Sequence, residues 1–221
     1  GNDIEIYHTG AVDMIEGKSL YLIQESQNII LRNLAGDEAY AKFFGNGAVE
    51  LYHNGTKQVE TSTNGLAFPS GKGIDFSADG NAGGMSSELL DDYEEGVFNP
   101  TMANSVTLHS GSDTLSYVKV GHLVTVTGVL RINSGNSGAD FSITNMPFAT
   151  VNSTESSGNA IGSVSIYDNN MNSGFSQVIC VMNPNSTQLN VVLQRQSGSQ
   201  SVGLDASDNG YIGVSICYRA A

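Results

Sequence analysis

The chain has 221 residues, with 26 glycines, 4 prolines, no tryptophan and only 14% charged residues. This composition favours short strands joined by polar turns over a helix-rich protein. Its 22 acidic and 9 basic residues give a formal net charge of −13, which excludes the basic surface that nucleic-acid binding requires. No run of 18 apolar residues occurs, so we expect no membrane insertion. Composition and charge together predict an all-β protein without a nucleic-acid partner.

Residues 1–70 are predicted to form a repetitive β stem. Polar turns that contain Gly or Asn separate short apolar runs at 3–8, 19–24, 28–33, 40–44, 48–53, 57–61 and 66–68. Each run offers a core only two or three apolar side chains, by the usual strand lengths of about four to six residues. Such a segment buries little surface alone, so we expect it to need a partner, and a second copy is the simplest one.

One sequence occurs twice within this stem. "IEIYHTG" at residues 4–10 returns as "VELYHNG" at residues 49–55, and a glutamate follows each copy, Glu16 and Glu60. The matching pairs are Glu5 with Glu50, Tyr7 with Tyr52, His8 with His53 and Gly10 with Gly55. A metal bound by His8 and His53 is one interpretation, but zinc needs three or four ligands, and no zinc motif is present. We favour a structural repeat and expect no metal or cofactor.

Residues 71–96 are predicted to form a Gly/Ser-rich linker followed by a short acidic helix. The helix would begin at Ser86 or Ser87, place Leu89, Leu90 and Tyr93 at helical spacing, and end at Gly96. It would carry the carboxylates Asp91, Asp92, Glu94 and Glu95. Glycoside hydrolysis needs two carboxylates that flank one bond, whereas adjacent residues on a short helix diverge. We therefore interpret this run as a solvated face.

Residues 97–221 are predicted to form a C-terminal antiparallel β-sandwich of the jelly-roll type. Candidate strands lie at 105–109, 114–120, 122–132, 140–145, 160–167, 175–182, 187–194 and 211–218. In two of them strict alternation predicts one buried face, made of Val124, Val126, Leu130 and Ile132 in the first and of Ile212, Val214, Ile216 and Tyr218 in the second. Thr125, Thr127 and Arg131 would face the other way. Cys180 and Cys217 are expected to be buried free thiols.

The loops of this domain favour binding of a neutral, polar ligand. Asn, Gln, Ser and Asp side chains hydrogen-bond sugar hydroxyls, and a tyrosine ring can stack on a pyranose. The candidate ligand-binding residues are Tyr167, Asp168, Asn169, Asn170 and Tyr211; ordinary solvated hairpin tips are the alternative. No nucleophile motif is present, and Asp168, Asp205 and Asp208 cannot be paired from the sequence, so we assign no catalytic residue.

Four segments carry a resemblance to a known family: "DIEIYHTG", "AVELYHNGTKQVETSTNGLAF", "LLDDYEEGVFNPT" and "YVKVGHLVTVTGVLRI". They resemble the C-terminal part of bacteriophage tail fibre and tailspike-like proteins, especially those of marine phages. The resemblance implies a homotrimer on the virion tail, extracellular at the host surface, whose tip binds a bacterial surface glycan or an outer-membrane protein. It also implies contact with other phage tail proteins through an N-terminal region outside this sequence. The alternatives are a tail-associated glycan depolymerase and a carbohydrate-binding module of a secreted protein.

Overall fold

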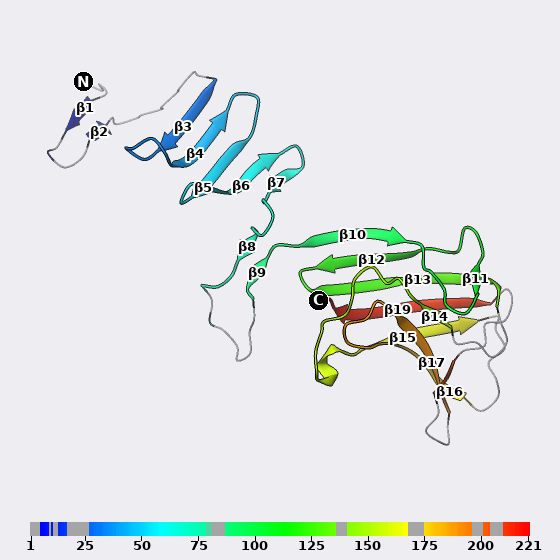
Figure 1. Ribbon diagram of the computed structural model, residues 1–221. Coiled ribbons are helices and arrows are strands. Elements are labelled where there is room, and N and C mark those ends of the chain that lie inside the picture. Colours follow the sequence, from blue (N-terminus) through cyan, green and yellow to red (C-terminus); the bar gives the residue numbers. More distant parts are fainter. Residues whose placement is uncertain are drawn as a thin grey trace. The chain divides into compact units, whose positions relative to one another are not determined.

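The computed structural model describes residues 5–8, 10, 13–16, 27–78, 80, 87–135, 141–167, 175–195, 201–203 and 210–221. The chain divides into two compact units, Gly1–Gly73 and Ile74–Ala221. Among the described residues the regular structure is antiparallel β, apart from one 3-10 turn at Ser156–Gly158 (Figure 1). The predicted all-β class is therefore confirmed, and the division between the units lies inside the segment predicted as a linker.

The first unit contains a two-stranded hairpin and a five-stranded meander. The hairpin pairs β1 (Glu5–His8) with β2 (Asp13–Glu16). The meander runs in chain order through β3 (Asn28–Arg32), β4 (Ala39–Phe44), β5 (Val49–His53), β6 (Thr56–Ser62) and β7 (Gly65–Ala67). These strands match the apolar runs predicted from 28 to 68; the run at 19–24 lies outside the described residues. Tight turns at residues with positive φ, such as Asn54 (48°) and Gly55 (68°), keep successive strands adjacent.

The repeated sequence forms a repeated hairpin. β1 and β2 pair with Glu5 opposite Glu16, and β5 and β6 pair with Glu50 opposite Glu60. The pairs of the first hairpin run without a shift to His8 and Asp13, whereas the second hairpin turns at residues 54–55 and has a bulge between the pairs of Leu51 and Tyr52. The first copy has two more residues between its innermost pairs, and the bulge of the second copy adds one, so the glutamates are 11 positions apart in the first copy and 10 in the second.

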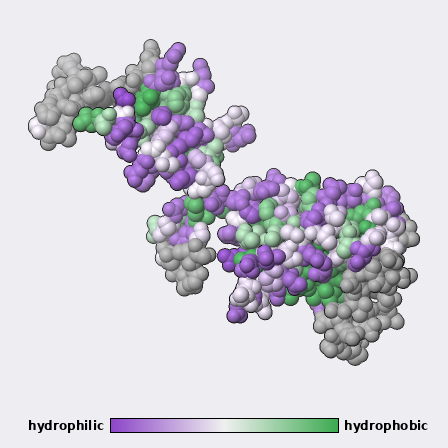
Figure 2. All heavy atoms as spheres, viewed as in Figure 1, coloured by the Kyte–Doolittle hydropathy of each residue, from purple (hydrophilic) through white to green (hydrophobic). Residues whose placement is uncertain are grey.

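The five-stranded sheet has one apolar and one polar face. Cross-strand pairing and alternation along each strand set these faces. We call one of them the apolar stem face, which consists of Ile29, Leu31, Ala41, Phe43, Val49, Leu51, Val59 and Leu66. Within this five-stranded sheet Ala41 is the one buried hydrophobic residue. Large hydrophobic residues therefore reach the surface of a single chain, and Figure 2 shows hydrophobic residues beside hydrophilic ones on the visible side of this unit.

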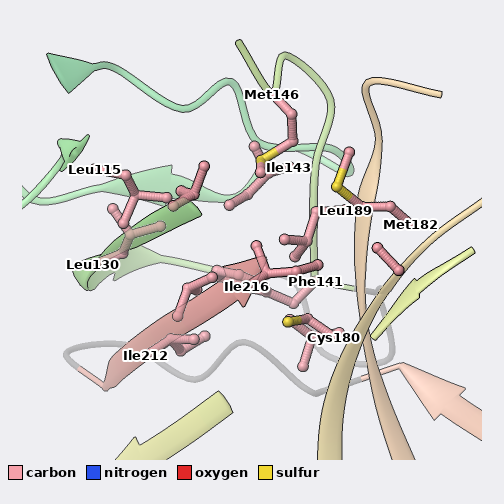
Figure 3. Packing of buried hydrophobic residues seen from close by; sticks show 14 of the residues in the cluster. Leu115, Leu130, Phe141, Ile143, Met146, Cys180, Met182, Leu189, Ile212 and Ile216 are labelled. Carbon is pink, nitrogen blue, oxygen red and sulfur yellow. The ribbon is translucent and has the colours of Figure 1, made fainter. Parts of the chain in front are cut away.

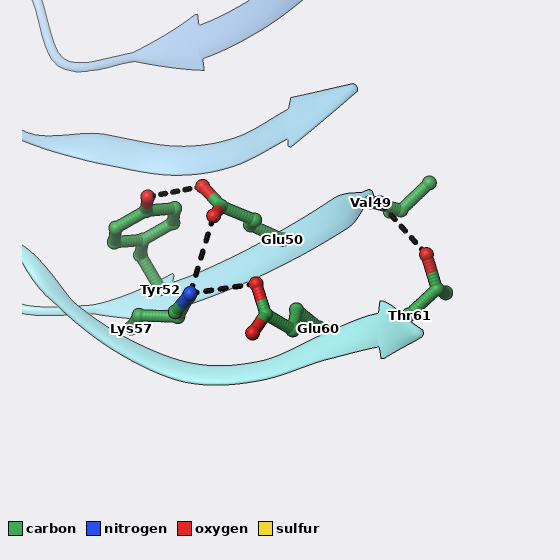
Figure 4. A network of polar contacts seen from close by, with 6 residues as sticks. All are labelled: Val49, Glu50, Tyr52, Lys57, Glu60 and Thr61. Carbon is green, nitrogen blue, oxygen red and sulfur yellow. Dashed lines mark hydrogen bonds and ion pairs between the residues drawn. The ribbon is translucent and has the colours of Figure 1, made fainter. Parts of the chain in front are cut away.

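The opposite face carries a network of charged and hydroxyl groups (Figure 4). The Tyr52 hydroxyl donates to Glu50 Oε2 at 2.5 Å, and Lys57 Nζ lies 3.3 Å from Glu50 Oε1 and 2.6 Å from Glu60 Oε2. The hydrogen bond from Tyr52 lowers the pKa of Glu50, and the bond to Glu60 raises the pKa of Lys57. Lys42 Nζ lies 4.6 Å from the centre of the Tyr52 ring. These groups satisfy one another and can stay hydrated, so this face is suited to solvent.

The second unit begins with a small sheet of β8 (Ile74–Asp75) and β9 (Leu89–Leu90). Its remaining strands form one ten-stranded antiparallel sheet in the order β10-β12-β13-β19-β15-β16-β17-β14, to which β11 and β18 add at β13 and β17. The bounds are β10 (Tyr93–Phe98), β11 (Thr107–Leu108), β12 (Leu115–Val120), β13 (Leu123–Ser134), β14 (Ser142–Ile143), β15 (Ala160–Tyr167), β16 (Phe175–Met182), β17 (Leu189–Arg195), β18 (Ser201–Gly203) and β19 (Tyr211–Arg219).

This sheet curls so that its two ends meet. Met102, just after β10, forms a bridge with Ile143 of β14, the strand at the other end of the order. Backbone bonds from Ala103 N–H to Ser142 O and from Thr144 N–H to Thr101 O, both 2.9 Å, flank this bridge. The strands therefore belong to one continuous curled sheet, not to two separately hydrogen-bonded sheets (Figure 1).

The core lies inside the curl (Figure 3). The inward residues predicted for 122–132 and 211–218 are all buried, as are Phe141, Ile143 and Leu189 from the facing part of the sheet. Both cysteines are free. Cys180 is buried, and burial raises the pKa of its thiol to about 11. Cys217 is exposed, so the prediction of burial is wrong for it: alternation along β19 places it on the outer face, between the inward Ile216 and Tyr218.

The acidic helix predicted before Gly96 is wrong. Residues 93–98 form β10, which pairs with β12 over its whole length, Tyr93 opposite Val120 and Phe98 opposite Leu115. The spacing of Leu89, Leu90 and Tyr93 suggested a helical period, but in the strand Glu94, Gly96 and Phe98 lie on one face and Tyr93, Glu95 and Val97 on the other. The pairing of β10 with β12 therefore stabilises the strand more than local propensity stabilises a helix. Ser86, one of the two proposed caps, lies outside the described residues.

Candidate functional site

A row of three side chains crosses the outer surface of the second unit at one end of the sheet. Tyr167, the last residue of β15, lies opposite Tyr211, the first residue of β19. Tyr211 in turn lies opposite Arg131 of β13. Because directly opposed residues project to the same face of a sheet, pairing alone places the three side chains side by side. We call Tyr167, Tyr211 and Arg131 the tyrosine row.

The two rings are stacked. Their centroids are 4.6 Å apart and their planes differ by 4°. Arg131 Cζ lies 5.4 Å from the centre of the Tyr211 ring, within the range of a cation–π contact. Tyr211 therefore has neighbours on both sides, whereas Tyr167 stands at the end of the row. This stacking fixes the orientation of the Tyr167 ring, which lowers the conformational entropy that a ligand contact would cost.

Tyr167 is 49% exposed. The registered pairs between β15 and β16 run from Ala160 to Ser163, so Tyr167 lies beyond them. A pre-oriented tyrosine ring that combines an apolar face with a hydroxyl can stack on the C–H face of a sugar and hydrogen-bond to it. The tyrosine row therefore has the chemistry of a small platform for a polar, uncharged ligand.

The structure brings together two of the five predicted binding residues, Tyr167 and Tyr211. Asp168, Asn169 and Asn170 lie outside the described residues. Arg131 was not among the binding residues predicted from the sequence, although alternation in 122–132 placed its side chain on the outer face. The missing information was the pairing of β13 with β19, which no local pattern provides.

The carboxylates of the acidic run do not converge on one site. Asp92 forms an ion pair with Lys119, and Glu94 accepts a hydrogen bond from the Tyr117 hydroxyl. Glu95, on the other face of β10, accepts one from the Tyr93 hydroxyl at 2.8 Å. These bonds raise the pKa of both tyrosines, because a phenol that donates to a carboxylate holds its proton more tightly. Asp168, Asp205 and Asp208 lie outside the described residues.

Asp92 is expected to stabilise the second unit. Its partner Lys119 is buried, with its ammonium 5.4 Å from the centre of the Phe148 ring. Asp92→Ala would leave this ammonium without its carboxylate, which should lower the free energy of unfolding by about 1–3 kcal/mol. The exposed neighbour Asp91 is a matched control, and Asp91→Ala should change it by less than about 0.5 kcal/mol. Urea denaturation measures both; equal effects would contradict the assignment.

Among the residues that the structure describes, no three His, Cys, Asp or Glu side chains are grouped so that they could hold a metal ion. Across the same part of the chain, no helix has the length and apolar character needed to cross a membrane. Side-chain positions are not described for His8, so the interpretation of a site shared with His53 stays untested.

Comparison with known proteins gave no neighbour. No protein-family model matches the chain, and searches among curated proteins and among solved structures also returned no match.

Proposed function

We propose that this protein is an adhesive structural protein of the bacteriophage tail-fibre type. In this proposal it forms a homotrimer on the virion tail, and its second unit is a jelly-roll-like tip that binds a bacterial surface glycan outside the host cell. An outer-membrane protein is the second candidate receptor. The sequence resemblance suggested this function. The observation that carries it is the apolar stem face, an exposed hydrophobic sheet surface that suits assembly with further copies.

The sheet of the first unit buries too little apolar surface by itself. A five-stranded sheet with a single buried hydrophobic residue does not bury enough apolar surface to offset the conformational entropy lost on ordering it. Covering the face with the same face of other copies would supply the missing burial at about 25 cal/mol per Å² of apolar surface. The polar face with its Glu50, Lys57 and Glu60 network would then remain in water.

The tyrosine row supports the choice of a glycan as receptor. A tyrosine platform without tryptophan gives weak single-site binding, and three tips held together would raise the apparent affinity through avidity. The net charge of −13 disfavours strongly anionic ligands and favours neutral sugars. No catalytic step is part of this proposal.

Glycan binding tests the proposal. The full chain would be applied to an array of purified bacterial lipopolysaccharides and capsular polysaccharides. Tyr167→Ala should weaken binding to any responding polysaccharide by about tenfold or more, because it removes the stacking surface at three sites. Tyr40→Ala is the matched control. Tyr40 is similarly exposed but lies in the first unit, so this variant should bind the polysaccharide as the wild type does.

Four results would count against this proposal. Equal binding by the Tyr167→Ala chain would remove the tyrosine row from the site. No response on the array by the wild-type chain would remove glycans as receptors. Release of reducing ends from a responding polysaccharide would favour the glycan depolymerase, and a stable monomer that binds sugar would favour a carbohydrate-binding module.

A further inference from the structure

The second unit has a broad outer face that nothing in the described structure of that unit covers. It lies on β10, β12, β13, β19 and β15, on the side opposite the core. We call it the outer sheet face and define it by four cross-strand rows. They are Tyr93, Val120, Leu123 and Arg219; Glu95, Val118, Thr125 and Cys217; Val97, Ser116, Thr127, Ser215 and Ser163; and Val129, Gly213 and Ser165. Ile161, two residues before Ser163, projects to the same side.

This face is poor in charge and rich in exposed hydrophobic residues. Glu95 and Arg219 are its only ionisable groups at neutral pH apart from the thiol and the phenol, and their charges cancel. Val97 is 71% and Ile161 67% exposed, and Val118, Val120, Leu123 and Val129 are also exposed. In a chain with a net charge of −13, two copies repel each other least where each presents a neutral surface.

Two hydroxyl groups near the centre of the face already have partners within it. Ser116 Oγ donates to Thr127 O at 3.1 Å, and Thr125 Oγ1 donates to Cys217 Sγ at 3.7 Å. A hydroxyl that is already hydrogen-bonded costs less to remove from water than one left without a partner. The face therefore combines aliphatic side chains with hydroxyls that tolerate burial.

The size of the face fits a protein–protein contact. Each outward residue covers about 33 Å² of a flat sheet, from strand spacing and rise per residue. The four rows and Ile161 thus project over roughly 600 Å², and protruding side chains raise the accessible area toward the ~800 Å² per partner of a standard interface. A small ligand would cover only a fraction of this surface.

We propose that the outer sheet face packs against the outer sheet faces of other copies of this chain. A self-complementary contact follows from its neutrality, its aliphatic content and its extent. The tyrosine row lies on the same side of the sheet, beyond the row of Val129 and at the end of β13. It therefore sits at the rim of the contact, where a ligand can still reach Tyr167.

The proposal goes beyond the proposed function, which places association of the copies in the stem. The two share only the requirement that copies associate, so the test must separate them. Cys217 is a natural probe, because it lies on the outer sheet face and is exposed in a single chain. The buried Cys180 is an internal control for unfolding.

The experiment measures alkylation of the full native chain by N-ethylmaleimide, with the two thiols resolved by peptide mass analysis and the mass in solution measured in parallel by light scattering. We expect Cys217 to react at least about tenfold more slowly than in the Val97→Lys chain, in which an unpaired charge opposes burial of the face. Val97 is three strands from Cys217, roughly 14 Å at the usual strand spacing, so its charge does not act on the thiol directly. Thr154→Lys, in an exposed loop, is the control and should label like the wild type.

Each outcome decides one question. Slow Cys217 labelling that Val97→Lys restores, with Cys180 still protected, supports the contact. Fast labelling of Cys217 in a wild-type chain that is oligomeric overturns the contact and leaves the stem assembly of the proposed function standing. Fast labelling in a wild-type chain that is monomeric overturns both. Labelling of Cys180 in Val97→Lys would mean unfolding, and the exposed Ile161→Lys then replaces it as the test variant.

Discussion

Gly162→Val should unfold the second unit at a markedly lower denaturant concentration than the wild type. A Cβ at Gly162 of β15 would lie 2.6 Å from Ser215 O, 2.7 Å from Cys180 Sγ and 2.7 Å from Ile216 Cβ. These are a backbone atom and two core side chains of the strands on either side, β19 and β16, so no flexible chain end can move aside. Overpacking of a core typically costs 1–3 kcal/mol, and a β-branched side chain here should cost about 3 kcal/mol or more.

The neighbouring glycine on β19 provides the control. A Cβ at Gly213 would meet nothing closer than 3.5 Å, so Gly213→Ala should change the free energy of unfolding by less than about 1 kcal/mol. Denaturant unfolding, followed by the reactivity of the Cys180 thiol, measures both variants. A Gly162→Val chain that unfolds at the wild-type midpoint would show that β15 and β16 do not pack as described.

Leu51→Glu should strongly weaken assembly of the chain, whereas Ile30→Glu should leave it intact. The two side chains are almost equally exposed in a single chain, at 49% and 52%, but they lie on opposite faces of the same sheet. Leu51 stands between Ala41 and Val59 on the apolar stem face, and Ile30 stands opposite Lys42 on the polar face. Losing a buried leucine costs about 1.5–3 kcal/mol, and burying a carboxylate costs more. This cost recurs in every copy, so association should weaken by more than a hundredfold.

Light scattering coupled to size exclusion measures this comparison. The wild type and Ile30→Glu should show a mass near three times 23.2 kDa that persists on dilution, and Leu51→Glu should show a lower mass that falls further on dilution. If the wild type is monomeric, or if both glutamates dissociate it equally, the apolar stem face does not hold the copies together.

Most strands could be predicted from the sequence because their ends are marked locally. Ala160–Tyr167 and Phe175–Met182 match the predicted ranges, since loops rich in Gly, Ser and Asn flank apolar runs of regular period. Tyr93–Phe98 was missed because two acidic residues follow a pair of leucines, which locally imitates the start of a helix. Its true state depends on β12, with which it pairs only after the chain has folded back.

The candidate site illustrates the same limit. Tyr167 and Tyr211 could be proposed singly from their residue type and loop position. Their stacking could not, because 44 positions separate them and only the register of β15 on β19 sets them face to face. Arg131 joins through a second such register, and local sequence contains no signal for either.

The place of β19 has a consequence for synthesis. In chain order it is the last of the ten strands, yet it lies in the interior of the sheet, between β13 and β15, and it shares nine residue pairs with β13. On a translating ribosome β10, β12 and β13 can pair as they emerge, and so can β15, β16 and β17. Apart from the bridge between Met102 and Ile143, the described strands of the two groups are joined through residues 211–219, which are synthesised after both. Folding of this unit should therefore be completed only after β19 has emerged, and it should be slow, as its long-range pairing implies.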